Sequence, residues 1–559
     1  DFSSHRQLAE NYGALNKHQI AQASELLQAQ MLQPININPV PLQMADTNLG
    51  ILQGSGPSSP AYNEYNPLFN RNQVRLQAGG VYGQQDTYGD EVTLNALYAR
   101  YSISLGQLYY RTDGFRNNND LKKEIYDLFT QVSVTYQTSV QAEVKYTDQK
   151  NGDLPLRFNP ALTDETLRSN EYASSVRLGL RHSFTPNSDL LVSLSYRYAN
   201  YDDTFSDAFF NYDTPQKENG YMGELQYLYR SDRYRAIAGG GYASVVGNGT
   251  FDITMPMPPG PPIPILNLPY DNDTHHANGY LYTYTNWPQP VTWTLGLSYD
   301  KQTVGFYNNL EQDQMNPKIG MIWNPLAATT IRAAAFRTLQ RTLLTGQTLE
   351  PTQVAGFNQF YHDGTGADSW HYGIGLDQKI TDSIFVGAEG SWRDINLPYL
   401  SGTSTVLTTD WDEKTARVYL YWIPHRWLAL TAEYQYERFE TTPEAPSELY
   451  STLSKTQKVP LGVQFFHPVG FFAGIKGTYV NQDVTTATAV TFPYTYYDGS
   501  DNFWVFDAAL GYRLPKRFGI ISVEAKNIFN AGFNFTETNW RNPSIQPERV
   551  ILGKITLYF

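Results

Sequence analysis

The chain has 559 residues, a formal net charge of -13, 42 tyrosines and no cysteine. The acidic balance argues against a nucleic-acid-binding protein, and the absence of cysteine excludes disulfides and thiolate metal sites. No window approaches the ~18 consecutive apolar residues of a membrane-spanning helix. Abundant tyrosine, a mean hydropathy of -0.45 and short alternating segments are instead typical of a transmembrane β-barrel, in which only every second residue meets lipid. The chain begins at Asp1 without a visible signal peptide, so we expect it to be processed or to be part of a longer protein.

Residues 1–33 are predicted to be helical and to lie in the periplasm. Two segments, 4–15 and 18–32, flank a break, and the second is rich in alanine, glutamine, leucine and glutamate, which favour helices. The spacing resembles one tetratricopeptide unit, carried by His5, Leu8, Ala9, Tyr12, Ala21 and Pro34. His5 stands at the tryptophan position of that unit and Glu25 at its second aromatic position, so a plain helical hairpin fits equally well. One repeat cannot bury its own face, so the resemblance implies further repeats before Asp1.

Residues 34–71 are predicted to be a linker. Six prolines interrupt any regular structure there, namely Pro34, Pro39, Pro41, Pro57, Pro60 and Pro67. We expect this linker to lie in a barrel lumen or along the periplasmic rim.

Residues 72–559 read as one strand after another. Short turns are predicted near Tyr101, Thr138, Pro186, Asp232, Gln289, Pro325, Asp382, His425, Pro468 and Pro515. Longer loops are predicted at 84–90, 114–123, 151–169, 203–218, 247–275, 305–313, 341–369, 397–410, 440–453, 484–502 and 530–548. Ten turns and eleven loops separate 22 strands. An even number of strands, with short turns on one side and long loops on the other, is typical of an outer-membrane barrel.

The two faces of the strands differ in polarity. In 427–440, Leu428, Leu430 and Tyr434 share one face, whereas Glu433 and Glu437 share the other. A basic side chain facing lipid would cost roughly 2–4 kcal/mol at mid-bilayer, so we expect the charged faces to line the lumen. The lumen-lining candidates are Glu143, Lys145, Arg177, Arg181, Arg197, Glu433, Glu437, Lys476 and Lys554. Both signs of charge occur, so no simple ion selectivity is implied.

The most unusual loop contains Met255–Pro269, which is both proline-rich and apolar. We predict an extended polyproline conformation outside the sheet. Because an exposed apolar loop is costly, we expect it to fold over the pore or to dock on a partner, with a disordered loop as the alternative. The gating or docking candidates are Met255, Pro258, Pro261, Ile263, Ile265 and Leu266.

Candidate chemistry is sparse. His275-His276 follows Asp271 and Asp273 and is compatible with a surface metal site, although polar loop residues without fixed geometry are the favoured interpretation. Residues 363–368 lack the spaced oxygen ligands of a calcium loop. We find no nucleophile–base signature and no phosphate-binding glycine loop. The sequence therefore predicts no catalytic, cofactor or metal site, and no enzyme.

The last eleven residues, 549–559, alternate with a period of two and end on an aromatic residue, as in a strand that closes an outer-membrane barrel. Several segments of the barrel region resemble those of TonB-dependent outer-membrane receptors. They are Asn316-Pro317-Lys318-Ile319-Gly320 with Trp323-Asn324-Pro325, Ala335-Phe336-Arg337-Thr338, Leu349-Glu350-Pro351-Thr352, Gly511-Tyr512-Arg513, 523–530 and Pro547-Glu548-Arg549-Val550. The resemblance implies 22 strands and import.

Two departures from that family bear on the mechanism. Thr352 replaces the usual glutamate, and we find neither a plug-like stretch nor a TonB-contacting box in the about 71 residues before the barrel. A helical unit joined to a barrel resembles instead the tetratricopeptide-bearing outer-membrane proteins, some of which export polysaccharide.

The sequence thus predicts an antiparallel outer-membrane β-barrel of about 22 strands with a short helical segment at its periplasmic amino terminus. The favoured function is a translocation channel in the bacterial outer membrane, whose cargo crosses the lumen. The alternative is an anchor or docking protein whose loops and periplasmic repeats bind partners. Expected partners are outer-membrane lipid and lipopolysaccharide, together with periplasmic or surface proteins, but no nucleic acid.

Overall fold

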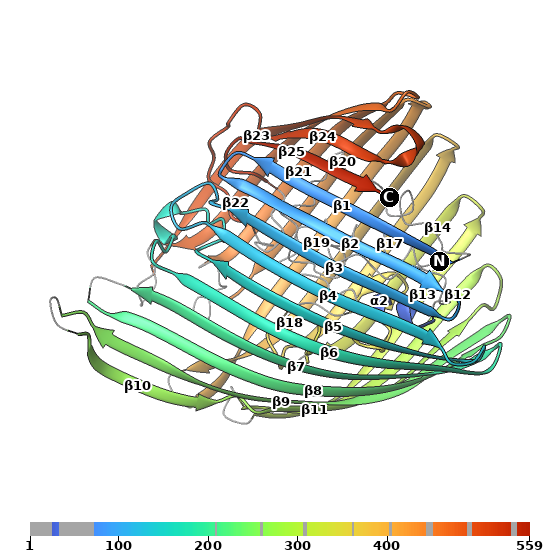
Figure 1. Ribbon diagram of the computed structural model, residues 1–559, viewed down its shortest axis with the longest axis horizontal. Helices are drawn as coiled ribbons and strands as arrows, with labels where there is room; N and C mark the ends of the chain where they lie inside the picture. The colour runs from blue at the N-terminus through green and yellow to red at the C-terminus, as the bar shows by residue number, and fades with distance from the viewer. Residues whose placement is uncertain are drawn as a thin grey trace.

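The computed structural model describes residues 25–32 and 72–559, except for 207–208, 258–260, 306–309, 342, 360–362, 402–404, 443–450, 489–494 and 538–544. Most of the described chain lies in strands that form one closed antiparallel wall (Figure 1). No helix in these ranges is long and apolar enough to cross a membrane.

The wall begins with strands β1 (Gln73–Gly83), β2 (Thr87–Tyr98), β3 (Tyr101–Thr112), β4 (Leu121–Ser133), β5 (Thr138–Asn151), β6 (Arg168–Thr185), β7 (Ser188–Ser206), β8 (Asn211–Arg230), β9 (Tyr234–Met255), β10 (Ile263–Asp271), β11 (Thr274–Thr285) and β12 (Val291–Val304). It continues with β13 (Leu310–Leu326), β14 (Thr329–Leu339), β17 (Asp368–Thr381), β18 (Ile384–Ser401), β19 (Thr405–His425), β20 (Leu428–Glu440), β21 (Ser451–Phe466), β22 (Phe471–Ala487), β23 (Tyr496–Arg513), β24 (Gly519–Lys526) and β25 (Val550–Tyr558). Outside the wall lie helix α2 (Glu25–Leu32), the hairpin strands β15 (Gln353–Val354) and β16 (Phe357–Asn358), and short 3-10 helices at Pro160–Leu162 and Pro515–Arg517.

The wall has 22 strand positions, as predicted. Strands β10 and β11 occupy a single position because both pair with β9, β10 with residues 248–255 and β11 with residues 234–245. The barrel closes where β1 pairs with β25, in register from Gln77 opposite Tyr558 to Gly83 opposite Leu552. The predicted closing strand and all ten predicted short turns are confirmed.

Several predicted long loops are shorter than expected. Strand β7 runs to Ser206 and β8 begins at Asn211, while β18 and β19 leave only residues 402–404 between them. The segment predicted as loop 84–90 is a turn at 84–86. The polar residues that were predicted to form loops remain in the strands. The strand ends project beyond the apolar band, where both faces of a sheet can be hydrated.

The prediction that Met255–Pro269 stays outside the sheet is wrong for Met255, the last residue of β9, and for 263–269. Residues 263–269 belong to β10, which pairs with the end of β9 and has a register shift between Pro264 and Leu266. Among the described residues β10 pairs only with β9, so it is an edge strand, where proline is tolerated. The strand prolongs the wall (Figure 1) rather than folding over the pore, and Ile265 is 50% exposed. Pro258 lies outside the described residues.

The outer face of the wall is apolar and the inner face is polar. In β5, Val140 and Val144 are exposed on the outer face, whereas Gln141 and Glu143 point inward, and Gln141 is buried. Tyrosine rings form a ladder across the outer face of β4–β7, with centroids 5.9, 5.3 and 6.0 Å apart, through Tyr126, Tyr146, Tyr172 and Tyr198. An apolar outer band edged by tyrosine and a polar lumen define a transmembrane barrel.

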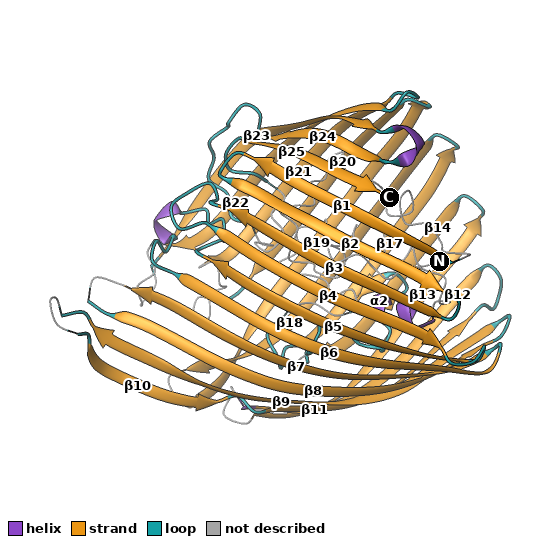
Figure 2. Ribbon diagram, in the orientation of Figure 1, coloured by secondary structure: helices purple, strands orange, loops and turns teal. Residues whose placement is uncertain are grey.

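Helix α2 lies inside the barrel, against the inner face of the wall (Figure 2). Leu27 and Met31 are buried against inward-facing Leu191, Leu228 and Ile237. Residues 25–32 fall within the segment predicted to be helical, but they pack inside the barrel and not in the periplasm, where 1–33 was predicted to lie. The rest of 1–33 and the linker 34–71 lie outside the described residues, so their assignment to the periplasm and the lumen stays a prediction.

Candidate functional site in the barrel lumen

The segment between β14 and β17 turns into the barrel instead of remaining at its rim. We call residues 343–359 the lumenal segment. The chain on either side of this segment is held together, because the Gln340 amide donates to the Ala367 carbonyl at 2.7 Å and the Gly366 amide donates to the Gln340 carbonyl at 3.0 Å. Between these ends, Thr348, Leu349 and the other residues of the segment's centre are buried against the wall. The segment therefore fills part of the lumen.

Apolar side chains anchor the lumenal segment at two places. Leu344 packs against Met222, Ala243 and Val245 on β8 and β9. Leu349 belongs to the same buried cluster as Leu27 and Met31 of α2. The lumenal segment and α2 are thus parts of one packed unit inside the barrel.

The β15–β16 hairpin rests on a part of the wall that has glycine in place of side chains. Its turn is formed by Ala355 and Gly356, with φ of 50° and 90°. A Cβ added to Gly320 would lie 2.8 Å from the Ala355 Cβ, and a Cβ added to Gly373 would collide with the Phe357 ring. The hairpin can therefore approach the backbone of β13 and β17 directly.

Gly373→Val is expected to displace the hairpin, because the added Cβ and methyl groups occupy the space of the Phe357 ring. The reporter is a cysteine placed at Val354, which is buried in the hairpin. We expect that cysteine to react with a water-soluble thiol reagent at least tenfold faster in the Gly373→Val protein than in the parent. Gly279→Val on β11 is the control, since a Cβ there meets only one atom, at 4.0 Å. Equal labelling rates in the parent and the Gly373→Val protein would contradict the packing of the β15–β16 hairpin against Gly373.

Charged groups join the lumenal segment to the wall. Arg341 Nη1 lies 3.2 Å from Asp300 Oδ1, and Arg341 Nη2 lies 2.9 Å from Glu350 Oε2. Asp300 lies also 2.9 Å from His276 Nε2 and accepts a hydrogen bond from Asn316 at 2.7 Å. All these side chains are buried, so each carboxylate is removed from water but keeps a cationic or polar partner.

Further polar contacts extend this network along the segment. The Glu224 carboxylate accepts hydrogen bonds from the Leu349 amide, at 3.0 Å, and from the Thr348 hydroxyl. The Tyr282 hydroxyl donates to Glu350 at 2.7 Å. The Gln226 amide donates to the Leu349 carbonyl. The wall beneath the segment is therefore polar on β8, β11, β12 and β13.

A second group of inward-folded residues comes from the loops 152–167 and 527–549. Phe535 and Ile545 pack on inward-facing Val480, Phe503 and Val505 of β22 and β23. The Gln482 amide donates to the Thr536 carbonyl at 2.8 Å. This group narrows the lumen over another part of the wall.

The predicted lumen residues lie on the inward faces of their strands, mostly in ion pairs. The pairs are Glu143 with Arg177, Arg181 with Asp189 at 3.1 Å, Arg197 with Glu218 at 3.9 Å, Glu433 with Arg417 at 2.8 Å, Lys476 with Asp507 at 3.4 Å and Lys554 with Glu524 at 2.8 Å. Lys145 lies two residues after Glu143 on β5, and Glu437 is buried. Arg177 and Arg181 also reach α2, through the Gln30 side chain and the Leu32 carbonyl, both at 3.2 Å. A role for these residues in transport stays a prediction.

The two adjacent histidines have different partners on β9 and β12. Because neighbouring side chains of a strand point to opposite faces, His275 contacts Ser244, with Nδ1 and Oγ 3.0 Å apart, whereas His276 contacts Asp300. Within the described ranges, no group of three or more histidine or carboxylate side chains is arranged to hold a metal ion.

Sequence reasoning missed the residues that fix the lumenal segment. Arg341 and Asp300 are 41 positions apart, and Leu349 and Glu224 are 125 positions apart. The only local signal was the resemblance of 349–352 to a receptor loop, which carries no information on its wall partners.

No protein-family model matches the chain, and no curated protein matches its sequence. Solved structures do match. The copper transporter OprC has a TM-score of 0.67 at 12% identity, over 88% of this chain and 80% of that one. The ferripyoverdine receptor of the outer membrane of Pseudomonas aeruginosa has a TM-score of 0.64 at 11% identity, over 88% and 72%. The siderophore receptor PiuA from Acinetobacter baumannii has a TM-score of 0.64 at 11% identity, over 88% and 82%.

At this level of identity the matches establish the fold alone. The chain has the outer-membrane β-barrel architecture found in these transporters and receptors, as the resemblance of its sequence predicted.

Proposed function

We propose that this chain is an outer-membrane transporter whose cargo crosses the barrel lumen, and that the lumenal segment is its gate. The fold supports a transporter, because similar structures are those of a copper transporter and of receptors for siderophores. The observation that carries the proposal is the buried polar network between the centre of the lumenal segment and the wall.

A segment that fills a lumen permanently would be held most firmly by apolar packing. Here the wall beneath the segment is polar. Glu224 accepts a hydrogen bond from the segment, and Arg341 joins Asp300 of the wall to Glu350 of the segment. Asn316 donates a hydrogen bond to Asp300. The attraction within a buried ion pair roughly offsets the free-energy cost of removing its charges from water. When the segment leaves, water can hydrate the same groups, so the free-energy difference between docked and released states stays small.

Helix α2 supplies a means of control in this proposal. Leu27 and Met31 share a buried cluster with Leu349, so displacing α2 would expose that leucine to water. A pull on the amino-terminal region would therefore weaken the docking of the gate. This step also rests on the predicted periplasmic position of the residues that precede α2.

Cross-linking the gate to the wall tests the proposal. The natural chain has no cysteine, so Gly320→Cys/Ala355→Cys introduces a single thiol pair. The Cβ atoms start 2.8 Å apart, and a shift of about 1 Å brings them to disulfide distance. In planar-bilayer recordings we expect the oxidised protein to open at least tenfold less often than the reduced protein. Each single-cysteine variant should be unaffected by reductant.

Equal opening frequencies in the oxidised and reduced double variant would contradict the gate and favour the alternative, an outer-membrane anchor or docking protein. One observation favours that alternative. Ile263, Ile265 and Leu266 of β10 are exposed on an apolar strand beyond the band that meets lipid. Such a strand fits a protein partner at the cell surface.

A further inference from the structure

The loop-side ends of β7, β8 and β9, together with β10, project beyond the rest of the wall (Figure 1). We call them the wall extension, which comprises residues 199–206, 211–218, 247–255 and 263–271. Side chains alternate between the two faces of a strand, so the inward positions continue from Leu191 on β7, Met222 on β8 and Ile237 on β9. The inner face of the wall extension therefore consists of odd-numbered residues on β7 and β9 and of even-numbered residues on β8.

The inner face of the wall extension is apolar. The rings of Phe205 and Tyr212 are stacked with centroids 4.5 Å apart, and the Phe251 ring lies 6.2 Å from that of Tyr212. On β10, Leu268 stands opposite Phe251. Leu266 and Leu268 are 38% and 42% exposed. An apolar surface is therefore open to water above the mouth of a lumen whose wall is polar.

The outer face of the wall extension is polar instead. Asp213 stands opposite Asp252 of β9, which accepts a hydrogen bond from Asn267 of β10. The two faces thus have the opposite polarity to those of the membrane band. Lipid and a neighbouring barrel meet only the outer face, so an occupant of the apolar inner face has to come through the mouth.

The wall extension is also strongly acidic. Residues 199–218 and 247–273 contain one basic residue, Lys217, and eight acidic ones. The acidic residues are Asp202, Asp203, Asp207, Asp213, Glu218, Asp252, Asp271 and Asp273. A binding partner of this region is therefore expected to carry positive charge.

Three carboxylates lie on the inner face beside the apolar surface. They belong to Asp203, to Glu218 and to Glu171 of β6, which stands opposite Tyr201. Among the described residues, Arg197 is the only cation on this part of the inner face, 3.5 Å from Glu171 and 3.9 Å from Glu218. The Asp203 side chain has no ion pair or hydrogen bond within the described ranges. The inner face therefore keeps an excess of negative charge.

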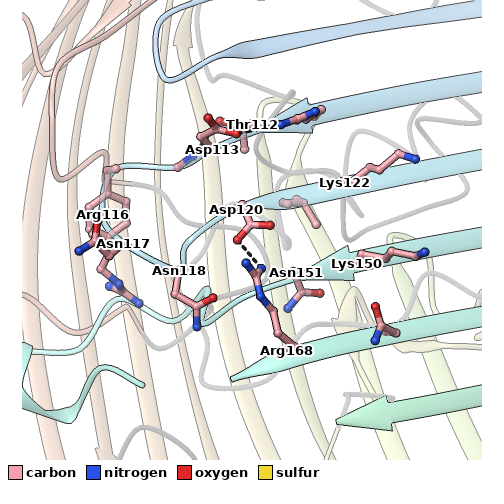
Figure 3. Close-up of a pocket in the computed structure, with 15 residues that line it drawn as sticks. Thr112, Asp113, Arg116, Asn117, Asn118, Asp120, Lys122, Lys150, Asn151 and Arg168 are labelled. Carbon is pink, nitrogen blue, oxygen red and sulfur yellow. Dashed lines mark hydrogen bonds and ion pairs between the residues drawn. The ribbon is translucent and has the colours of Figure 1, made fainter. Parts of the chain in front are cut away.

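The nearest arginine of the adjoining strand does not neutralise Asp203. Arg168 of β6 stands opposite Thr204, so it points to the outer face. It lines a separate cavity of about 910 Å³ and pairs with Asp120 at 2.5 Å (Figure 3). This cavity therefore adds no cation to the inner face.

We propose that the inner face of the wall extension is the first binding site of the cargo, and that the cargo is an organic cation with an aromatic or alkyl group. The apolar group would pack on Phe251 and Leu268, and the cationic group would lie beside Asp203 and Glu218. The faces of tyrosine rings also attract cations. This inference rests on the proposed transport, for which it names the class of cargo.

The site leads directly to the proposed gate. Gly220 follows Glu218 by two positions on β8, and a Cβ added to Gly220 would collide with Leu344 of the lumenal segment. Cargo on the wall extension would thus lie next to the part of the lumenal segment that packs on β8 and β9.

The test measures the affinity of para-(trifluoromethyl)benzylammonium for the purified protein by fluorine NMR. We expect Asp203→Asn to weaken binding about fivefold, the effect of one exposed ion pair. Asp271→Asn is the matched control, because it removes the same charge from an exposed residue on the outer face of the same extension. It should leave the affinity unchanged. Both variants should retain the heat-resistant migration of a folded barrel.

The apolar and cationic parts of the site are tested separately. Leu266→Ser/Leu268→Ser should weaken binding of the ammonium about tenfold, because it removes apolar surface that the ring would cover. For the parent protein, the uncharged para-(trifluoromethyl)benzyl alcohol should bind about fivefold more weakly than the ammonium. The corresponding benzoate should bind more weakly still.

Three results would overturn the proposal. Equal affinities for the ammonium and the alcohol would exclude a cationic cargo and favour a protein partner on this apolar surface. Equal effects of Asp203→Asn and Asp271→Asn would exclude the inner face as the site. Displacement of the ammonium by equimolar calcium would leave a metal site instead. None of these equilibrium measurements needs an open gate, so they can fail while the cross-linking test of the gate succeeds.

Discussion

Replacing the lumenal segment with a short glycine-serine linker is expected to turn a closed barrel into one with a large, steady conductance. A barrel of this size encloses a lumen wide enough to need a plug. The wall should survive, because β14 and β17 pair in register from Thr329 to Leu339 without any help from the segment. The backbone hydrogen bonds of Gln340 with Ala367 and Gly366 already bring the two sides of this loop together, so a short linker spans the gap. Single-channel conductance in a planar bilayer measures the effect.

Shortening the β9–β10 extension at 250–269 is the matched control, because it removes a similar length of chain from the same rim but outside the lumen. That variant should stay closed. A closed channel in both variants would place the block in α2 or in the loops 152–167 and 527–549. The lumenal segment would then not be the gate.

Arg341→Met is expected to destabilise the docked state of the gate by about 3–5 kcal/mol, since it leaves two buried carboxylates without their common guanidinium. Each ~1.4 kcal/mol changes an equilibrium tenfold, so the open fraction should rise by roughly two to three orders of magnitude. Opening frequency in single-channel recordings is the readout. Adding Glu350→Gln should recover part of the loss, because Asp300 keeps His276 and Asn316.

Arg337→Met is the control for the loss of an arginine. Arg337 forms two hydrogen bonds with Asp368, at 2.9 and 2.5 Å, but both side chains are about one-third exposed. An exposed ion pair is worth only about 0–1 kcal/mol. If Arg337→Met opens the channel as much as Arg341→Met, the buried network is not what holds the gate.

The wall of the barrel was predictable because each strand carries its own signal. Alternation in segments such as 139–147 separates a lipid face from a lumen face within a few residues, and the turn residues follow at regular spacing. The gate carries no such signal. A loop rich in threonine, glycine and glutamine, such as 341–369, has the same composition whether it meets water outside the barrel or a polar wall inside it. Its position depends on hydrogen-bond partners up to 125 positions away, such as Glu224 for Leu349.

The error at β10 has a different origin. Proline within Ile263–Asp271 argues against a strand in the middle of a sheet, where every amide must find a partner. Within the part of the chain that the structure describes, β10 pairs only with β9, so it is an edge strand, where proline is tolerated. Whether the second edge of β10 has a neighbouring strand is decided only in the assembled wall, so the local sequence could not show it.

The pairing of β1 with β25 also constrains how the barrel is assembled. The Ile551 amide bonds the Gln84 side chain across 467 positions, so the seam can form only after the rest of the wall exists. Until then both edge strands present unsatisfied amides and carbonyls, which are templates for aggregation. Bringing such distant ends together is also entropically slow. A chain with this seam needs a helper that shields or pairs its two open edges until they meet.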